Sequence, residues 1–524
     1  MERRVRVRFA PSPTGPLHMG GVRTALYNYL FAKKHGGDFI LRIEDTDQNR
    51  FVPGAEQYII DSLKWSGVLP NEGVGFSDGD YAPYRQSDRK QTYHQYAEKL
   101  VTDGNAYYAF DTPAELEDIR KNMEADKQTF SYNSVTRMQL KNSLTMSSEE
   151  VKQSIDSNAH YVVRLKVPVN EEIHVKDLIR GDVMVNTHEM DDKVLFKSDG
   201  MPTYHLANVV DDYLMKISHV IRGEEWLPSA PLHVLLYRCL GWESVMPAFA
   251  HLPLLLKPDG NGKLSKRDGD RLGFPVFPLN WNDPETGELS SGYREKGYFP
   301  EAFVNIIALL GWHPEGNQEL FTMDELIENF SMERVNKAGA KFDPEKAKWF
   351  NMQYLKKHTD EELAVIYKSE LDSMSKDGKL KANNDNPNVN FLIQNLDYLK
   401  EIIRLTREKI HFTNELWNFS HFFFIAPRSF DQSVIDKKWN TKTRAFFVAL
   451  EKTLNEKDEI SIQSLEEIFP KLAAENEIKQ GEVMQLCRVL LTGISGGPLL
   501  FDMIVLLGKT EVAKRINFAL KTLS

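Results

Sequence analysis

The fold of this chain is decided by residues 4–47, which read RVRVRFAPSPTGPLHMGGVRTALYNYLFAKKHGGDFILRIEDTD. Apolar side chains alternate with arginines over residues 4–9, and this period of two predicts a strand. Apolar residues then recur at helical spacing over residues 22–30, and a second apolar run follows at 39–43. Strand, helix and strand in this order predict a βαβ unit and therefore a parallel sheet.

The whole chain is long enough for several domains. It has 524 residues, of which 41% are hydrophobic and 27% are charged, and its length predicts roughly three to five domains. The composition excludes a disordered or collagen-like protein. The two cysteines, Cys239 and Cys487, are too few for a disulfide framework or a four-thiolate zinc site.

Neither a membrane span nor an export signal is expected. The longest apolar run is six residues, Ala445–Leu450, whereas a membrane span needs about 20. Polar and proline residues follow the basic N-terminus where a signal peptide would have an apolar core. The formal charge of −10 excludes an overall basic coat, although specific RNA binding needs only a local basic track. We expect a cytoplasmic protein that does not contact membranes.

The pattern of residues changes along the chain. Residues 111–182 are polar and charged, and short strands such as 161–167 are expected toward the end of this stretch. The change indicates an inserted domain. Residues 273–298 are rich in Pro, Gly and Asn without clear periodicity and predict a surface insertion. Helical spacing dominates after Pro300, and the Lys-, Asn- and Asp-rich residues 376–390 predict a linker.

The sequence His18-Met19-Gly20-Gly21 lies where the first strand gives way to the first helix. In a parallel sheet, ligands bind at this end of the strands. The glycines let the backbone approach a ligand, the helix N-terminus attracts phosphate, and a histidine there can donate to phosphate oxygens in a transition state. Taken alone, this short pattern is more typical of a tight turn with a surface histidine.

A second element is the basic loop Lys263-Leu264-Ser265-Lys266-Arg267, which follows an apolar run and a glycine-containing turn. A loop with three cations could close over a triphosphate and stabilise the departing pyrophosphate. Taken alone, it is more typical of a solvated surface loop. In this order and flanking an insertion, the two elements together resemble the paired signatures of class I aminoacyl-tRNA synthetases.

Longer motifs resemble the glutamyl-tRNA synthetase family. They extend over nearly the whole chain and occupy residues 8–15, 42–47, 204–212, 221–226, 342–346, 490–493 and 506–509. The resemblance implies a Rossmann-type α/β catalytic domain with a parallel sheet, an α+β insertion domain and an all-helical C-terminal anticodon-binding region. The implied domains are the first catalytic half at 1–110, an insertion that grips the tRNA acceptor end at 111–196, the second catalytic half at 197–310, a helical stem-contact domain at 311–380 and the anticodon-binding domain at 381–524.

The resemblance also implies a two-step ligation. The α-carboxylate of L-glutamate attacks the α-phosphate of ATP, with Mg²⁺ bound to the nucleotide, and the tRNA ribose then takes the activated glutamyl group. The family binds its tRNA before activation proceeds. The expected partners are therefore ATP, L-glutamate and the tRNA for glutamate, and the lack of coiled-coil heptads favours a monomer.

Residue roles follow from the same match and from simple chemistry. Arginine binds carboxylates through paired N–H groups, so Arg8 and Arg222 are candidates for the two carboxylates of glutamate. Glu44 would take the ammonium group, and Ser12, Tyr204 and Asn208 would supply neutral hydrogen bonds. The match assigns ATP binding to His18, Gly20, Glu225, Leu255 and Lys266, and catalysis to His18, Gly20, Lys263 and Lys266.

Basic residues of the C-terminal region are candidates for reading the anticodon. Lys400, Arg404 and Arg407 fall on one helical face, which by itself is more typical of a solvated surface. The family places tRNA-binding residues at Arg407, Lys409 and Arg488. Lys409 stands where an arginine is expected in enzymes strict for the glutamate tRNA, so charging of the glutamine tRNA stays open.

Two departures from the family pattern concern the insertion. Some relatives have a zinc knuckle that opens with Cys-x-Cys after a Tyr-Tyr pair, but Tyr107-Tyr108 is followed by Ala-Phe-Asp. No structural zinc is expected, because the thiolates are missing. The Tyr-Asp-Gly-rich segment of the family appears as YNSVTR at 132–137, which leaves the acceptor-end contacts open.

Other functions fit the sequence less well. Glutaminyl-tRNA synthetases resemble the core, but their β-barrels and Pro-Glu-Pro-Asn type motif disagree with Pro11-Ser12-Pro13-Thr14 and the helical C-terminal third. The short paralogue that glutamylates a modified tRNA base lacks an anticodon domain. A small-molecule nucleotidyltransferase would leave the C-terminal helices unexplained, and a non-catalytic RNA-binding protein would not need His18 and Lys266.

Overall fold

The computed structural model describes residues 3–157, 160–260, 262–265, 268–269, 271, 273–376 and 389–523. The chain forms two compact units, one of Met1–Glu295 with Pro300–Phe350 and one of Lys296–Phe299 with Asn351–Ser524. The linker expected at 376–390 falls mostly on 377–388, outside the described residues.

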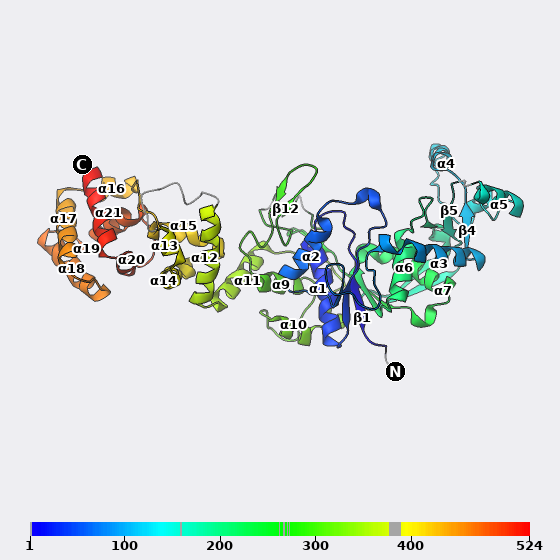
Figure 1. Cartoon of the computed structure of the whole chain (residues 1–524), viewed down its shortest axis with the longest axis horizontal. Helices are drawn as coiled ribbons and strands as arrows, with labels where there is room; N and C mark the ends of the chain where they lie inside the picture. The colour runs from blue at the N-terminus through cyan, green and yellow to red at the C-terminus, as the bar shows by residue number, and fades with distance from the viewer. Residues whose placement is uncertain are drawn as a thin grey trace. The chain divides into compact units, whose positions relative to one another are not determined.

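The first unit is built on the predicted βαβ unit. Strand β1 (Arg6–Phe9) is followed by helix α1 (Met19–Lys34) and strand β2 (Asp38–Leu41). The two strands are parallel, with Arg6 opposite Asp38 and Phe9 opposite Leu41. The prediction of a strand, a helix and a parallel strand is confirmed, because both strands are buried and α1 returns the chain across the sheet (Figure 1).

Two sheets lie edge to edge in this unit. The first has the order β1-β2-β3 and the second β7-β6-β10-β9. The backbone N–H of Ser218 donates to the Arg6 carbonyl oxygen at 2.8 Å, which places β9 beside β1. All neighbours are parallel except β6 and β7. The strands are β3 (Glu72–Gly73), β6 (Glu172–Asp177), β7 (Gly181–Asn186), β9 (His219–Gly223) and β10 (Ala248–Leu252).

Helix α1 is buried on several faces because it lies between the sheet and later helices. The Tyr27 hydroxyl donates to the Ala308 carbonyl oxygen at 2.9 Å, and Arg23 donates to the Leu310 carbonyl oxygen at 2.9 Å. Other described helices of this unit are α2 (Ala55–Trp65), α3 (Lys90–Thr102), α6 (Tyr204–Leu214), α7 (Ala230–Cys239), α9 (Pro300–Ala308) and α10 (Met323–Asn329), and α11 (Pro344–Lys357) begins in it. Strands β11 (Leu255–Leu256) and β14 (Ala340–Lys341) pair in parallel.

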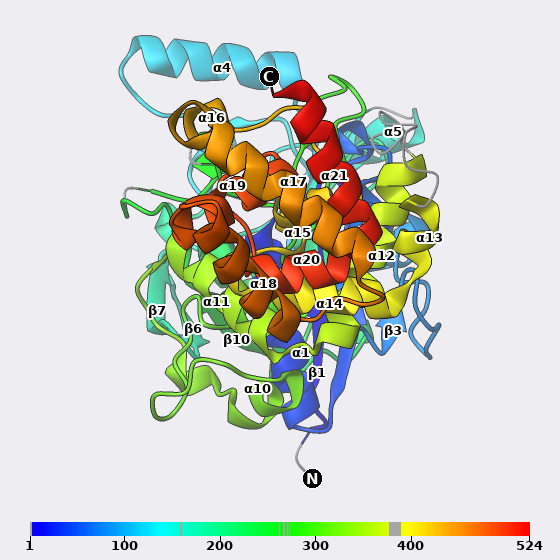
Figure 2. The same ribbon diagram turned by 90° about the vertical axis from the view of Figure 1, so that its left-hand side faces the viewer.

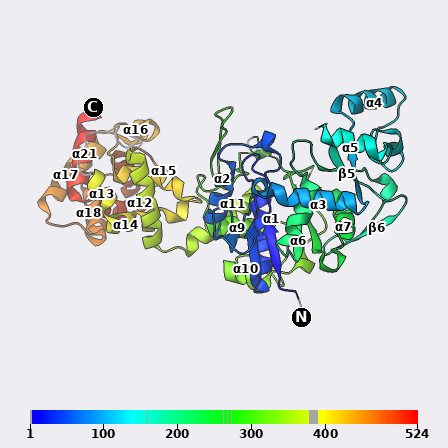
Figure 3. The ribbon, with the colours of Figure 1, turned by 45° about the vertical axis from the view of Figure 1, so that its right-hand side comes forward.

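The expected insertion contains a small sheet of its own. Strands β4 (Ala106–Ala109), β5 (Val162–Leu165) and β8 (Val194–Phe196) are antiparallel. Helices α4 (Pro113–Ala125) and α5 (Ser148–Asp156) accompany them, as Figure 3 shows. Strands β6 and β7 also fall within the expected range 111–196, but they pair with the larger sheet through β10.

Residues 273–298 are not the surface insertion that their composition predicts. They contain a short hairpin of β12 (Trp281–Asn282) and β13 (Leu289–Ser290), and several of their apolar side chains are buried. The Met19 N–H donates to the Val276 carbonyl oxygen at 2.8 Å. The prediction was wrong because the backbone here is irregular, so the buried apolar residues do not recur at a helical or strand period. They nevertheless pack against the start of α1.

The regular elements among the described residues of the second unit are all helices. Figure 2 shows α17 and α21 side by side, and they are in direct contact. Its helices are α12 (Asp360–Lys376), α13 (Val389–Gln394), α14 (Leu396–Thr406), α15 (Leu416–Ser420), α16 (Gln432–Lys438), α17 (Thr441–Glu456), α18 (Ile462–Glu475), α19 (Gln480–Thr492), α20 (Leu500–Leu507) and α21 (Lys509–Thr522). No helix among the described residues is both long and apolar enough to span a membrane.

Candidate active site

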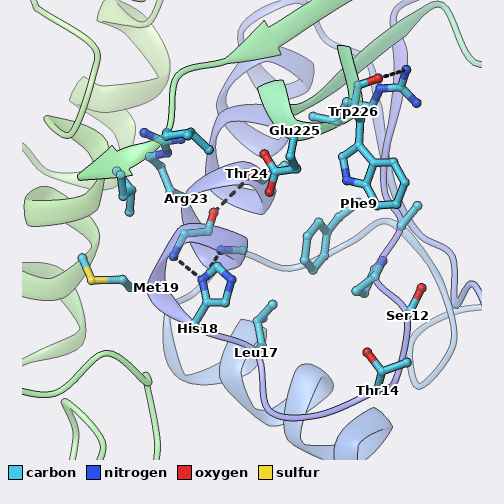
Figure 4. Close-up of a pocket in the computed structure, with 18 of the residues that line it drawn as sticks. Phe9, Ser12, Thr14, Leu17, His18, Met19, Arg23, Thr24, Glu225 and Trp226 are labelled. Carbon is cyan, nitrogen blue, oxygen red and sulfur yellow. Dashed lines mark hydrogen bonds between the residues drawn. The ribbon is translucent and has the colours of Figure 1, made fainter. Parts of the chain in front are cut away.

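A cavity of about 420 Å³ opens at the carboxyl ends of β1 and β9, beside the start of α1 (Figure 4). It brings together the described residues that were predicted to bind glutamate and ATP or to act in catalysis. These are Arg8, Ser12, His18, Gly20, Glu44, Tyr204, Asn208, Arg222, Glu225, Leu255 and Lys263. Lys266 lies outside the described residues, so its place relative to the cavity stays a prediction.

His18 caps the N-terminus of helix α1. Its Nδ1 atom accepts hydrogen bonds from the backbone N–H groups of Gly20 at 3.0 Å and Gly21 at 3.3 Å, which Figure 4 marks. The protein atoms around the ring and the nearby Lys263 cation lower the pKa of His18, although the residue is exposed to the open cavity. The ring is therefore neutral, and because Nδ1 accepts, the proton is on Nε2. His18 can donate this proton to an anion in the cavity.

The two glycines after His18 are required by close contacts. A Cβ atom at Gly20 would lie 2.9 Å from Cε1 of His18, and one at Gly21 would lie 2.3 Å from Cδ1 of Leu17. A larger residue would displace the histidine ring at Gly20 and the Leu17 side chain at Gly21. The N–H groups of residues 19–22 donate to the Val276 carbonyl oxygen and to His18, so the start of the helix favours an anion through the positive end of its dipole.

Glu225 and Lys263 form an ion pair at the rim of the cavity. Lys263 Nζ lies 3.1 Å from Glu225 Oε1. Burial raises the pKa of Glu225, but its own backbone N–H and Lys263 outweigh burial and lower it. The basic loop is joined to β11 through the Leu264 N–H, which donates to the Leu255 carbonyl oxygen at 2.8 Å. The loop therefore begins beside the helix N-terminus.

Arg8 is buried in the cavity wall and is bound to an acidic residue. Its Nε and Nη2 atoms donate to the two carboxylate oxygens of Asp212 at 2.9 and 3.2 Å. Arg42 Nη1 donates to the same carboxylate at 2.8 Å. These bonds use two of the five N–H groups of Arg8. Within the part of the chain that the structure describes, no partner is seen for its Nη1 atom, which can meet a ligand.

Glu44 lies on the same network. Its Oε1 atom accepts from Arg42 Nη2 at 2.9 Å and from Asn208 Nδ2 at 2.9 Å. Burial raises the pKa of Glu44, opposed by the charges of Arg42 and Arg8. Among the described residues nothing donates to Oε2, which is therefore suited to receive a cation such as an ammonium group.

Arg222 projects from the end of β9 into the opposite wall. Its Nη1 atom donates to the Tyr204 hydroxyl oxygen at 2.7 Å. The Tyr204 ring packs against Trp226 with centroids 4.5 Å apart, and burial raises the pKa of Tyr204 to about 12. Tyr204 therefore acts as a neutral hydrogen-bonding group beside a fixed guanidinium.

The sequence matches known proteins over its full length. A profile described as tRNA synthetases class I (E and Q), catalytic domain, matches residues 4–349, and one described as anticodon binding domain matches residues 382–520. A glutamate–tRNA ligase of Cytophaga hutchinsonii is 54% identical over 524 residues, 100% of this chain and 98% of that protein. One of Flavobacterium psychrophilum is 54% identical over 523 residues, 100% of both chains. The chain belongs to the glutamate–tRNA ligase family.

Solved structures of this family agree with the fold. The crystal structure of a glutamate tRNA ligase from Elizabethkingia meningosepticum, in complex with its amino acid, has a TM-score of 0.90 at 48% identity, covering 99% of this chain and 100% of that one. The glutamate–tRNA synthetase of Elizabethkingia anophelis has a TM-score of 0.86 at 48% identity, with the same coverage. The predicted fold class is confirmed, and the chain is a class I ligase with a parallel-sheet catalytic domain and a helical anticodon-binding domain.

The second unit of this ligase differs from the alternative with anticodon-reading β-barrels. Within its described residues the regular elements are helices alone. The basic face predicted at Lys400, Arg404 and Arg407 is paired with acids: Lys400 with Glu361, Arg404 with Glu401 and Asp502, and Arg407 with Asp360. The face is therefore largely neutralised.

The three residues predicted to bind tRNA have different surroundings. Arg407 donates to Asp360 and to the backbone carbonyl oxygens of Leu355 and His358, the latter at 2.9 Å. It thereby satisfies carbonyl groups near the end of α11. Lys409 and Arg488 instead donate to the carbonyl oxygens of Gly497 and Pro498, so that both side chains meet one loop.

Several residues of the site were missed by sequence reasoning. Asp212 and Arg42 lay within the quoted motifs but received no role, because nothing in their spacing shows that they bind Arg8 and Glu44. His251 and Asp177 were not singled out at all. Among the described residues, no group of three or more His, Cys, Asp or Glu side chains could hold a metal ion. The absence of zinc stays a prediction.

Proposed function

We propose that the chain joins L-glutamate to the 3′ end of its tRNA at the expense of ATP. One observation carries the proposal: a single cavity combines two arginines, a buried carboxylate and a helix N-terminus with a neutral histidine. The arginines match the carboxylates of glutamate, the buried carboxylate matches its ammonium group, and the helix terminus matches a phosphate. The names of the full-length relatives support the same function.

The amino-acid subsite is proposed to lie between Arg8, Arg222 and Glu44. The open Oε2 atom of Glu44 takes the ammonium group, while the two guanidinium groups take the carboxylates. Tyr204 and Asn208 sit between these charges and, with Ser12, provide neutral hydrogen bonds. This arrangement favours a substrate with two negative charges and one positive charge.

The ATP subsite is proposed to lie at the start of α1. His18 donates from Nε2 to a phosphate oxygen, and Gly20 lets the backbone approach. Glu225 and the backbone at Leu255 contact the nucleoside, while Lys263 and Lys266 meet the phosphates. The carboxylates lining the cavity, Glu44 and Glu225, are already bound to cations, so Mg²⁺ would be held chiefly by the phosphates and water.

The chemistry proceeds in two balanced steps. An oxygen of the α-carboxylate attacks the α-phosphorus, the bond from this phosphorus to the bridging oxygen breaks, and pyrophosphate leaves with the electron pair. The terminal ribose hydroxyl of the tRNA then attacks the glutamyl carbonyl carbon, loses its proton and releases AMP. His18 and the lysines stabilise the charge that moves onto the departing phosphates.

The roles proposed for the parts of the chain follow the domains expected from the sequence. The catalytic halves are 1–110 and 197–310, the acceptor-end domain is 111–196, the stem-contact domain is 311–380 and the anticodon domain is 381–524. Arg407, Lys409 and Arg488 are proposed to bind tRNA. We also propose that the enzyme is a cytoplasmic monomer and that it activates glutamate only when tRNA is bound.

ATP–pyrophosphate exchange tests this function. Exchange should require glutamate and should depend on the glutamate tRNA. Glutamine in place of glutamate should give no exchange with or without tRNA. Exchange with glutamine alone would contradict the proposed substrate, and exchange with neither amino acid would contradict the activity.

A further inference from the structure

The guanidinium of Arg222 is surrounded by neutral partners. It is 5% exposed, and besides Tyr204 it donates from Nη2 to the Trp226 carbonyl oxygen at 3.2 Å and from Nε to His251 Nε2 at 3.0 Å. His233 Nδ1 lies 3.5 Å from Nη1. Among the described residues, no carboxylate lies within 4.0 Å of Arg222, in contrast to Arg8. Its positive charge is therefore available to a ligand.

His251 is held in turn by Asp177. Arg222 and His251 are directly opposite each other on β9 and β10. His251 Nδ1 lies 2.6 Å from Asp177 Oδ2, and both side chains are completely buried. The other oxygen of Asp177 accepts from the backbone N–H groups of Ile179 at 2.9 Å and Arg180 at 2.7 Å. The carboxylate is thus fixed at the end of β6.

This geometry determines where the imidazole carries its proton. Asp177 Oδ2 accepts, so the proton of His251 is on Nδ1, and the lone pair on Nε2 is free to accept from Arg222. Burial raises the pKa of Asp177, but His251 and the backbone N–H groups outweigh it and lower the pKa. Burial lowers the pKa of His251. The pair is accordingly an ionised carboxylate and a neutral imidazole.

We propose that Asp177 and His251 are positioning residues that fix the Arg222 guanidinium for the substrate carboxylate while leaving its charge unpaired. Three of the five N–H groups of Arg222 are used by Tyr204, Trp226 and His251. A fourth, on Nη1, has only the long 3.5 Å contact to His233, which a carboxylate can replace. A carboxylate placed directly on Nε would cancel the charge that distinguishes glutamate from glutamine. The neutral imidazole of His251 orients the guanidinium without cancelling its charge. This inference rests on the proposed function, in which Arg222 binds glutamate.

The variant Asp177→Asn tests the pair with little change in shape. Because two backbone N–H groups point at Oδ1, the amide oxygen must stay there and the amide NH₂ must face His251. The imidazole proton then moves to Nε2. Two N–H groups now point at each other, and the hydrogen bond from Arg222 Nε to His251 is lost. The KM for glutamate in aminoacylation should rise about 10- to 100-fold, as for a lost hydrogen bond to a charged group, while kcat changes less than about threefold.

A second pair of variants covers the case in which Asp177→Asn does not fold. His251→Leu removes the acceptor and should raise the KM for glutamate as strongly. His251→Gln places an amide oxygen near the position of Nε2 and should restore much of the affinity. His219→Gln is the matched control, since this histidine lies on β9 but bonds to Ser218, away from Arg222. It should leave the KM unchanged.

Coupling to Arg222 separates positioning from a merely structural role. In an Arg222→Ala background, Asp177→Asn should have no further effect on the KM for glutamate, because it acts through the missing guanidinium. An equal effect in both backgrounds, or a wild-type KM in Asp177→Asn and His251→Leu, would overturn the inference. A wild-type enzyme that charges no tRNA with glutamate would instead overturn the proposed function.

Discussion

Arg8 and Asp212 form a bidentate ion pair inside the cavity wall, with Nε and Nη2 of the arginine 2.9 and 3.2 Å from the two carboxylate oxygens. Burial raises the pKa of Asp212, but Arg8 and Arg42 outweigh it and lower the pKa. One carboxylate therefore orients two buried guanidinium groups, of which Arg42 also holds Glu44. The glutamate subsite depends on this shared anion.

We expect Asp212→Asn to weaken both stability and substrate binding. Losing one partner of a buried ion pair costs about 3–5 kcal/mol, and Arg8 and Arg42 would lose their common acceptor. Urea unfolding should show the loss, and the KM for glutamate should rise. Glu117→Gln, which removes an exposed pair with Arg120, should change stability by less than about 1 kcal/mol. Equal effects of the two variants would contradict the argument.

Gly20→Ala should impair activation with little effect on stability. The new Cβ would meet the His18 ring at 2.9 Å and displace it from the position in which it is proposed to contact the phosphates. Pyrophosphate exchange should slow about 100-fold, the cost of losing one transition-state donor. Gly481→Ala in helix α19 is the control, because no atom lies within 4 Å of its added Cβ. An unchanged exchange rate for Gly20→Ala would exclude the proposed role of His18.

Lys266→Ala should lower the activation rate by about 10²- to 10³-fold, since the contact is made chiefly in the transition state. The KM for ATP should change much less. Single-turnover formation of glutamyl-adenylate in the presence of tRNA measures the rate. A normal rate combined with weaker ATP binding would mean that Lys266 binds the ground state alone.

Buried histidines make the stability depend on pH. Burial lowers the pKa of His205 and of His219 to about 4, whereas an unfolded histidine titrates near about 6.5. Between these values the unfolded state binds more protons, so stability falls as the pH decreases from about 6.5 to about 4, by up to about 1.4 kcal/mol per pH unit for each group. His219→Gln should flatten the dependence of melting temperature on pH in this window. An unchanged slope would contradict the assignment.

Arg407→Ala and Lys409→Ala should differ in kind. Arg407 bonds to Asp360 and to carbonyl oxygens of its own unit, so its loss should lower stability and weaken charging of all tRNAs alike. Lys409 meets a single loop carbonyl, so its loss should cost about 1–3 kcal/mol on the cognate tRNA and little on one with an altered third anticodon base. Charging rates on both tRNAs distinguish the two, and a uniform effect of Lys409→Ala would make it a phosphate contact.

The sequence predicted those parts of the fold that local patterns encode. The alternation at residues 4–9 and the helical spacing at 22–30 correspond to β1 and α1, because each pattern reports which face of an element is buried. The burial of segment 273–298 was not predicted, since its backbone is irregular and the helices that it packs against are far away in the sequence. The cavity residues were found through family motifs. Asp177 and His251 could not be, because their contact joins strands 74 positions apart.

The cap on helix α1 gives the active site an acid limit of its own. A single lone pair on His18 Nδ1 both anchors the first turn and ensures that the opposite nitrogen carries the proton facing the cavity. A second proton, on Nδ1, would break both cap bonds, while Nε2 would keep its proton. Acidification would therefore slow the enzyme by removing the side-chain cap from the first turn of α1 and by disturbing the position of the His18 ring.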